Sequence, residues 1–232
     1  MRRRLLWVFI ALGIGASLTW YYRTTVILWL LAPARGALSA SGQPIFTGPT
    51  EMFNLAVRLT MLGGVLAATP VLVFQAYQLL RPLLSKRARR SVVLFLPAMA
   101  VCYLAGAAFA YFVLLPTGLR FLLLFGTDVA MPMIRITEYM DLALAMLFWL
   151  GVVFELPLVM LLLAKLRVVS YAKFGKVRRY VPAMAFILSA ILTPTFDIVN
   201  QTMVAVPLVL LYEAGMLLVW LARPRQTAAH RP

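Results

Sequence analysis

Six long apolar runs constrain the fold of this chain more than any other feature of its sequence. They cover residues 5–31, 52–80, 92–115, 142–163, 181–192 and 203–221. A helix needs about 20 apolar residues to cross a bilayer, and it satisfies its backbone hydrogen bonds within lipid. The runs therefore predict an all-α polytopic membrane protein with six transmembrane helices. The fifth run has only 12 residues and the sixth is interrupted by Pro207 and Glu213, so we expect the last two helices to be short.

The composition agrees with a membrane protein and excludes several other classes. Only 12% of the residues are charged, whereas a soluble domain has about 25%. The net charge of +15 would suggest a nucleic-acid partner for a soluble protein, but the basic residues here form short clusters between apolar runs, as the positive-inside rule describes. We therefore expect the lipid bilayer, and no nucleic acid, as a partner. A single cysteine, Cys102, and a single histidine, His230, exclude an internal disulfide and the usual Cys/His metal site, and we expect no cofactor.

The distribution of charge predicts the orientation of the chain. Of the 22 Lys and Arg residues, 17 fall within residues 1–4, 81–90, 165–179 and 223–232. Four of the seven acidic residues lie in or beside the opposite connecting segments: Glu51, Asp128, Glu138 and Asp141. Because cytoplasmic segments carry the excess of Lys and Arg, both termini are expected to be cytoplasmic. Residues 1–222 would then form a single six-helix transmembrane domain, and residues 223–232 a mobile basic cytoplasmic tail.

Two of the runs leave alternatives open. The first contains an aromatic and basic interruption around Tyr22, so its helix either ends there or continues as a longer tilted helix to Leu31. The fifth is either a short span that thins the bilayer locally or a re-entrant segment. Small residues around Gly106 allow close contact with a neighbouring helix, although Ala and Gly are also common filler in such spans. Kinks are expected at the prolines within or beside the runs: Pro70, Pro157, Pro194 and Pro207.

One carboxylate, Glu155, lies deep within the fourth run. It is roughly 20 Å from the start of that run and about 12 Å from its end, so it does not easily reach water on either side. An ionisable group at membrane depth costs at least a few kcal/mol and is usually retained for a function. The alternative is a glutamate that is simply protonated, or one that pairs with a neighbouring helix for structural reasons. Glu213, ten residues past the start of the sixth run, raises the same question.

The residue pattern does not suggest an enzyme. The sequence has no Ser/His/Asp set, no pair of carboxylates at helical spacing, no phosphate-binding loop and no dinucleotide fingerprint. Seven acids and one histidine leave little for general acid–base catalysis. What remains is a set of polar residues at or near membrane depth: Glu155, Thr193, Asp197, Asn200, Gln201 and Glu213.

Several short motifs, taken together, are similar to one known family. They are Ala68-Thr69-Pro70-Val71, Arg81-Pro82-Leu83, Arg89-Arg90, Ala108-Phe109-Ala110-Tyr111-Phe112, Phe154-Glu155-Leu156-Pro157, Leu192-Thr193-Pro194-Thr195 and Leu211-Tyr212-Glu213. Each motif is weak alone, but they occur in order and with near-constant spacing across residues 45–222. In this combination the chain resembles the TatC family, the multi-spanning core subunit of the twin-arginine protein translocase.

The resemblance implies a fold, a function and a set of site residues. The six helices would form a concave wall, a receptor and scaffold for the export of folded proteins, driven by the proton gradient across the prokaryotic cytoplasmic (inner) membrane. Its partners would be TatA-like and TatB-like single-span subunits and twin-arginine signal peptides, within a homo-oligomeric receptor complex. The implied positions are Arg2, Arg4, Arg89 and Arg90 for the signal peptide, Glu155 for the concave face, and Thr193, Gln201 and Glu213 for partner helices.

Two positions depart from the family pattern. The family usually has a glutamate directly before the first arginine of its basic start and another just before its arginine pair, and this chain has Met1 and Ala88 there. Such acids would hold the two guanidinium groups of a signal by charge-assisted hydrogen bonds. We therefore expect weak binding of a standard twin-arginine peptide. Two alternative functions remain open: a TatC relative that has lost signal binding, and a small proton-coupled secondary transporter that uses Glu155.

Overall fold

The structure, a computed structural model, describes residues 2–34, 44–80, 86–124, 134–166, 168–192 and 198–222. Within these ranges the chain is helical apart from short turns and one isolated bridge between Ile45 and Arg135. The predicted all-α class is confirmed. The elements are α1 (Arg2–Tyr21), α2 (Arg23–Leu31), η1 (Ala32–Ala34), α4 (Glu51–Leu80), α5 (Lys86–Phe109), η3 (Ala110–Leu114), α6 (Leu115–Leu124), α7 (Ile136–Phe154), α8 (Leu156–Lys165), α9 (Tyr171–Val177), η4 (Arg178–Tyr180), α10 (Val181–Leu192) and α11 (Ile198–Leu221).

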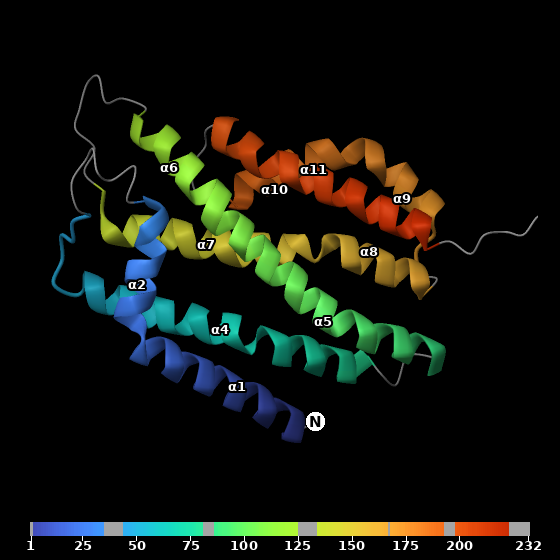
Figure 1. Ribbon diagram of the computed structural model, residues 1–232, viewed down its shortest axis with the longest axis horizontal. Coiled ribbons are helices and arrows are strands. Elements are labelled where there is room, and N and C mark those ends of the chain that lie inside the picture. The colour runs from blue at the N-terminus through green and yellow to red at the C-terminus, as the bar shows by residue number, and fades with distance from the viewer. Residues whose placement is uncertain are drawn as a thin grey trace, which may run out of the picture.

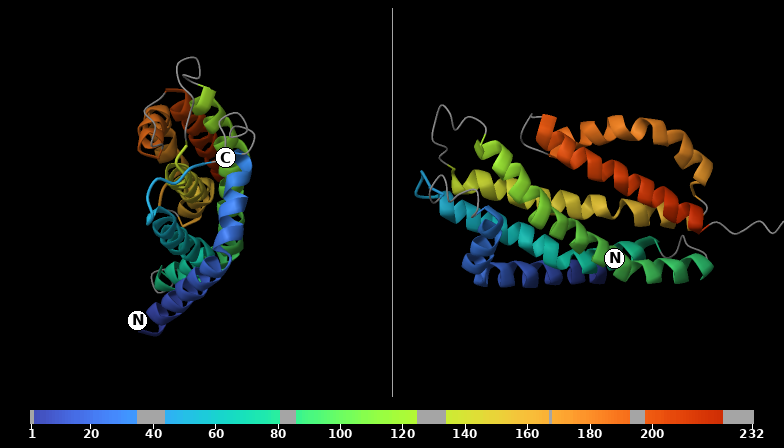
Figure 2. Two further views of the ribbon diagram at one scale, coloured as in Figure 1. Left: turned by 90° about the vertical axis from the view of Figure 1, so that its left-hand side faces the viewer. Right: turned by 45° about the horizontal axis from the view of Figure 1, so that its top comes forward.

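The long helices lie side by side in a bent slab. In Figure 1, α1 forms one edge, followed by α4, then α7 with α8, and then α11 with α10 at the other edge, while α5 crosses between them diagonally. Consecutive long helices run in opposite directions, and the end view in Figure 2 (left) shows the curvature of the slab. The main group of buried side chains joins α2, α4, η3, α6, α7 and α11, and it includes Leu55, Leu115, Met140 and Leu150.

Within the described residues, four segments are long and apolar enough to cross a membrane. They are Glu51–Thr69, Pro97–Phe121, Ile136–Lys165 and Gln201–Leu221. The apolar part of α1, Leu6–Tyr21, is shorter, and α10 has only 12 residues. These segments identify an integral membrane protein with several helical spans.

The first apolar run is divided at Tyr22, where α1 ends and α2 begins. Arg23 supports this break, because its Nη1 donates to the carbonyl of Trp20 at 3.2 Å. The same guanidinium lies 4.9 Å from the centroid of the Trp20 ring. Of the two alternatives for the first helix, the one that ends near Tyr22 is therefore correct.

Two tyrosine hydroxyls fix α2 after the break. Tyr111, in η3, donates to the carbonyl of Trp29 at 2.7 Å, and the two rings are stacked with centroids 4.0 Å apart. Tyr139, in α7, donates to the carbonyl of Leu30, whose side chain is buried. The carbonyl of Trp29 also accepts from the backbone N–H of Ala32, and the two tyrosines add hydrogen bonds from other helices at the end of α2, where helical donors run out.

Helices extend from both sides into the connection between the third and fourth apolar runs, which end at residue 115 and begin at residue 142. The helix continues through Pro116 to Leu124, and α7 begins at Ile136. Pro116 lies two residues after the end of η3, which is a π-helical segment. A π turn leaves one carbonyl without its usual donor, which suits a proline that has no N–H to give. At the other end, Glu138 lies in the first turn of α7, where a negative charge is favourable.

The basic segment at residues 165–179 contains the short helix α9. Ser170 starts that helix, since its Oγ accepts from the backbone N–H of Lys173 at 3.4 Å.

The prolines at which kinks were expected lie at different positions in their helices. Pro157 lies in the first turn of α8, whereas α11 continues through Pro207. Pro70 lies within α4. Thr193, Pro194 and the tail at residues 223–232 lie outside the described residues.

Candidate functional site

Glu155 occupies the break between α7 and α8. The break has a local cause, since Pro157 lacks an N–H and the carbonyl of Val153 therefore loses its usual helical donor. Glu155 itself stays near helical geometry, with φ −74° and ψ −16°, and its carbonyl accepts from the N–H of Val159 at 2.9 Å. The sequence thus places the acid at the interrupted turn of two otherwise continuous helices.

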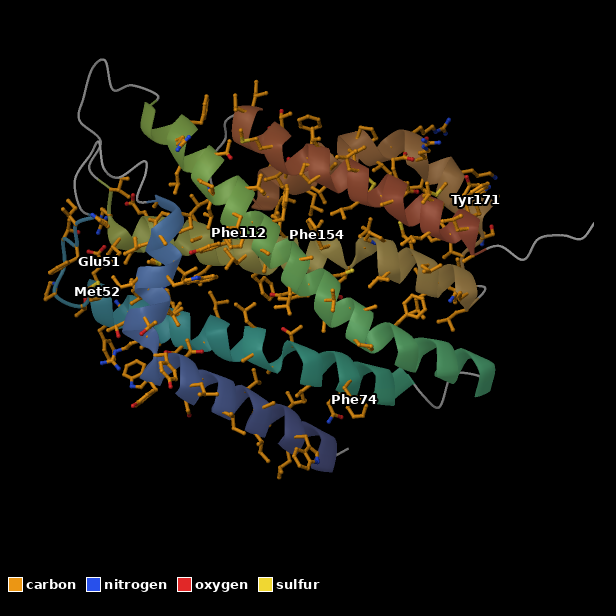
Figure 3. The ribbon with its side chains drawn as sticks, viewed as in Figure 1. Glu51, Met52, Phe74, Phe112, Phe154 and Tyr171 are labelled. Carbon is orange, nitrogen blue, oxygen red and sulfur yellow. The ribbon has the colours of Figure 1, made fainter. Side chains whose placement is uncertain are left out.

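This break lies near the middle of the long dimension of the molecule. Figure 3 shows Phe154, the residue before Glu155, between Glu51 near one end and Tyr171 near the other. The side chain of Glu155 is half-buried. Among the described residues, no hydrogen bond or ion pair satisfies its carboxyl group. An acid in this setting is available to a group from outside the chain, or to a neighbour on another helix.

Helix α5 brings two further polar side chains toward Glu155. Tyr103 and Cys102 both lie close enough to interact with it electrostatically. The ring of Tyr103 is 5% exposed and packs on Gly151, where an added Cβ would lie 2.5 Å from the ring. Gly151 is four residues before Glu155, so the two positions share one face of α7. Tyr103 therefore packs against α7 one turn before Glu155.

The rest of this contact is close and apolar. A Cβ added at Gly106 would lie 2.5 Å from the carbonyl oxygen of Leu150 and 2.8 Å from the side chain of Phe154. The rings of Phe109 and Phe154 are 5.6 Å apart, centroid to centroid. Of the two interpretations of Gly106, close helix contact and simple filler, the structure shows close contact. Apolar side chains on this side leave few polar groups that compete for Glu155.

Glu213 has a partner within the chain. Its Oε1 accepts from Nε of Arg178, in η4, at 2.6 Å. This hydrogen bond and the negative charge of Glu213 raise the pKa of the Arg178 guanidinium, so the cation persists. The hydroxyl of Tyr212 donates to the carbonyl of Phe174 at 2.7 Å. Both bonds attach the α9–η4 segment to α11. They lie beside a cavity of about 560 Å³ whose lining includes Tyr171, Arg178 and Glu213.

Gln201 connects the last two helices. Its Nε2 donates to the carbonyl of Phe186 in α10 at 3.2 Å. On the α10 side, an apolar groove of about 410 Å³ lies between α8, α10 and α11. Its lining includes Leu156, Met184, Leu188 and Leu208. The side chains of Ile187 and Ile191, also in this lining, are 64% and 73% exposed, so a large apolar face of α10 is open.

A polar cluster that the sequence reasoning missed lies at the opposite end, around Glu51. This side chain is buried, and its carboxylate accepts from the N–H groups of Thr47 and Gly48 at 2.6 and 3.1 Å and from the hydroxyl of Thr137 at 2.5 Å. Arg135 donates to Thr47 at 2.7 Å. The cluster fastens the segment before α4 to the start of α7. The available signal was Glu51 three residues after Gly48 at a helix start, the spacing at which a glutamate accepts from the backbone N–H of the N-cap residue.

The four predicted signal-peptide arginines lie in the first turns of two helices. Arg2 and Arg4 belong to α1, and Arg89 and Arg90 to α5. The starts of both helices lie at the same end of the molecule, on either side of the end of α4 (Figures 1 and 2). Along α5, Arg90 is about 20 Å from the level of Tyr103. The arginines and Glu155 are therefore separate sites.

No metal centre accompanies these sites in the described part of the chain, where no three His, Cys, Asp or Glu side chains are grouped to hold an ion. The sequence reasoning also missed Tyr103 and the partner of Glu213. A glycine one turn before Glu155 was the available signal for Tyr103, because it leaves space on that face. The pairing of Arg178 with Glu213 spans 35 residues and had no local signal.

Comparisons with known proteins agree with this architecture. A sequence model described as Sec-independent protein translocase protein (TatC) matches residues 1–207. The chain is 32% identical to the Sec-independent protein translocase protein TatC of Koribacter versatilis over 234 residues, which cover 100% of this chain and 86% of that protein. It is also 32% identical to the protein of the same name from Carboxydothermus hydrogenoformans, covering 96% of this chain and 90% of the relative.

A solved structure gives the same result for the fold. It is described as a crystal structure of the twin-arginine translocase receptor TatC, and it is 31% identical to this chain. The two superpose with a TM-score of 0.83, over 95% of this chain and 96% of the other. The sequence matches and the shared fold show that this chain belongs to the TatC family.

Proposed function

We propose that this chain is the receptor and scaffold subunit of a twin-arginine translocase, which exports folded proteins across the prokaryotic cytoplasmic membrane at the expense of the proton gradient. Membership of the TatC family and the likeness to a twin-arginine translocase receptor support this function. A translocase subunit of this kind is not an enzyme. A proton-coupled secondary transporter is not favoured, because the relatives are translocase proteins over nearly the whole chain.

The proposal includes six membrane crossings with both termini in the cytoplasm. The crossings would be α1, α4, α5 with α6, α7 with α8, α10 and α11. The alternating directions of these helices support an even number of crossings, and the starts of α1 and α5 and the end of α11 lie toward one end (Figure 1). The concentration of 17 of the 22 basic residues in the segments at that end supports its assignment to the cytoplasm.

Reporter fusions should separate the two faces. A reporter that is active only in the cytoplasm should be active after Arg90, Arg179 and Arg225, and inactive near Gly42, Asp128 and Asp197. A reporter that is active only outside should give the opposite pattern at each of the six positions. An external result after Arg179 would remove one crossing and would contradict the six-span arrangement.

The observation that carries the function at the level of residues is the half-buried Glu155 at the broken turn between α7 and α8. A structural acid would be expected to have a partner in the chain, as Glu51 and Glu213 do. Glu155 has none among the described residues. We infer that it receives a polar group of a transported chain or of a partner helix at membrane depth, where such groups need hydrogen bonds.

Replacing Glu155 should slow export while leaving the protein inserted. Glu155→Ala removes hydrogen bonds worth about 1.5–3 kcal/mol if one partner is charged, so we expect export to slow by roughly ten- to a hundredfold. Glu155→Gln should be milder, because it keeps a hydrogen-bonding side chain. The measurement is the export rate of a twin-arginine cargo. The matched control is Glu138→Ala, which removes an exposed glutamate from the same helix. Equal rates for Glu155→Ala and Glu138→Ala would favour a purely structural Glu155.

Signal peptides would bind at the cytoplasmic starts of α1 and α5, around Arg2, Arg4, Arg89 and Arg90. Their proximity to the end of α4 supports a shared surface (Figure 1). The strong positive charge of these segments attracts acidic groups of a cargo, but it opposes the twin arginines themselves.

TatA-like and TatB-like helices would bind along α10 and α11, beside the predicted positions Thr193, Gln201 and Glu213. The open apolar face at Ile187 and Ile191 and the groove behind it support this location. A single-span helix packs well into such a groove, since close van der Waals contact drives helix association in lipid. Glu213 is paired with Arg178 through Oε1, so a partner would compete with Arg178 or bind the other oxygen of the carboxylate.

A further inference from the structure

We propose that Tyr103 is a positioning residue for Glu155. Its hydroxyl is linked to the Glu155 carboxyl through one bridging water molecule, so that the acid is kept against α5 in one orientation. The inference rests on the proposed function of Glu155, and it adds the residue that orients this acid.

The first support is the burial of the Tyr103 hydroxyl. Its oxygen is fully buried, and no described protein group lies within hydrogen-bonding distance of it. Buried hydroxyls in proteins nearly always have a protein or water partner, because an unpaired one is costly. Glu155 is the carboxyl group that interacts with it electrostatically. Neither group has another described partner, so each is the natural partner of the other.

The second support is the register of α5 against α7. The two helices run in opposite directions (Figure 1), and Gly106 faces the backbone of Leu150 and the side chain of Phe154. Tyr103 is three residues earlier on α5, which moves it about 4.5 Å toward α8. That displacement brings it level with the break that carries Glu155.

Gly151 fixes the direction of the tyrosine ring. The ring lies where any side chain at position 151 would be, at 2.5 Å from an added Cβ. The hydroxyl end is therefore held on the face of α7 that also carries Glu155 one turn later. Cys102 interacts with Glu155 as well, but a thiol is a weak hydrogen-bond donor. Tyr103 is the stronger candidate for the same carboxyl.

A tyrosine suits this role in either protonation state of Glu155. Through the bridging water, its hydroxyl donates toward an ionised carboxylate, and it accepts from a protonated carboxyl. The orientation of the acid would thus be the same before and after a proton is taken up. A phenylalanine at this position would pack equally well on Gly151 and would lack only this bond.

The test uses Tyr103→Phe in the full-length protein, with Tyr111→Phe as the matched control. Tyr111 is eight residues later, and its hydroxyl has a partner of its own, the carbonyl of Trp29. The infrared band of the Glu155 carboxyl is identified by its loss in Glu155→Gln. We expect this band to shift in Tyr103→Phe and to stay unchanged in Tyr111→Phe. An unchanged band in Tyr103→Phe would overturn the proposal.

Export supplies the second readout. Tyr103→Phe should slow export by about three- to tenfold, the effect of one hydrogen bond, and it should have no further effect in a Glu155→Ala background. Equal slowing in both backgrounds would mean that Tyr103 acts independently of Glu155 and would overturn the positioning role. If Glu155→Ala itself leaves export unchanged, the function proposed for Glu155 fails, while the infrared band still decides whether Tyr103 orients it.

Discussion

Ala88→Glu should strengthen the binding of a twin-arginine signal peptide by about ten- to a hundredfold. The segment around Ala88 offers Lys86, Arg87, Arg89 and Arg90, and it has no acid to pair with the two guanidinium groups of a signal. One bidentate charge-assisted pair in a partly buried site is worth about 1.5–3 kcal/mol, which corresponds to that gain in affinity. The gain should be larger at low salt, because exposed charges are screened over about 8–10 Å at ordinary ionic strength.

The structure makes Ala88 a favourable position for this change. It is the third residue of α5, and a negative charge in the first turn of a helix is stabilising. Glutamate also has a helix propensity close to that of alanine. The variant should therefore fold as the natural chain does, so a change in affinity reports on binding.

The measurement is peptide affinity or crosslinking in detergent for the natural chain, Ala88→Glu and Ala88→Gln. The glutamine variant has the same size without the charge, and it should recover little. A signal with two lysines in place of its arginines should gain less from Ala88→Glu, because an ammonium group does not form the bidentate pair. Tight twin-arginine-dependent binding by the natural chain, unchanged by Ala88→Glu, would show that another acid holds the signal.

The sequence predicted those parts of the fold that depend on local chemistry. The limits of α10 match the fifth apolar run, and the break at Glu155 follows from a proline two residues later. Prediction failed where a distant or unusual backbone feature decides the outcome. The third apolar run ends at Leu115, but the helix continues through Pro116, because the π-helical turn before it accommodates a residue without an N–H. The sequence of residues 110–114 contains no motif that predicts a π-helical turn.

The candidate site shows the same division. Glu155 stands out in the sequence because a carboxylate in an apolar run is rare. Tyr103 does not, because a tyrosine in an apolar run is ordinary until its ring is seen on Gly151. Glu213 resembles Glu155 in sequence, yet the return of the chain through η4 supplies it with Arg178. The sequence predicts an interaction when the two partners are close together in the chain. When they are far apart, only the structure shows it, whatever their chemistry.

Gly106→Leu should destabilise the helix bundle by about 1–3 kcal/mol or more, the usual cost of overpacking. Its Cβ would lie 2.5 Å from the carbonyl oxygen of Leu150, a backbone atom that moves only if α5 and α7 separate. Tight packing between helices leaves no space that could absorb the new side chain. The separation would also move Tyr103 away from Glu155, so export should fall together with stability.

The control is Gly13→Leu in α1, where nothing lies within 4 Å of an added Cβ. Both substitutions gain about 1 kcal/mol of helix propensity, so their difference isolates the steric effect at the α5–α7 contact. The measurement is the unfolding midpoint in a denaturing detergent titration. We expect Gly13→Leu to match or exceed the natural chain and Gly106→Leu to unfold well before it. Equal midpoints for the two variants would mean that α5 and α7 separate at little cost, and that the close contact around Glu155 does not hold the fold together.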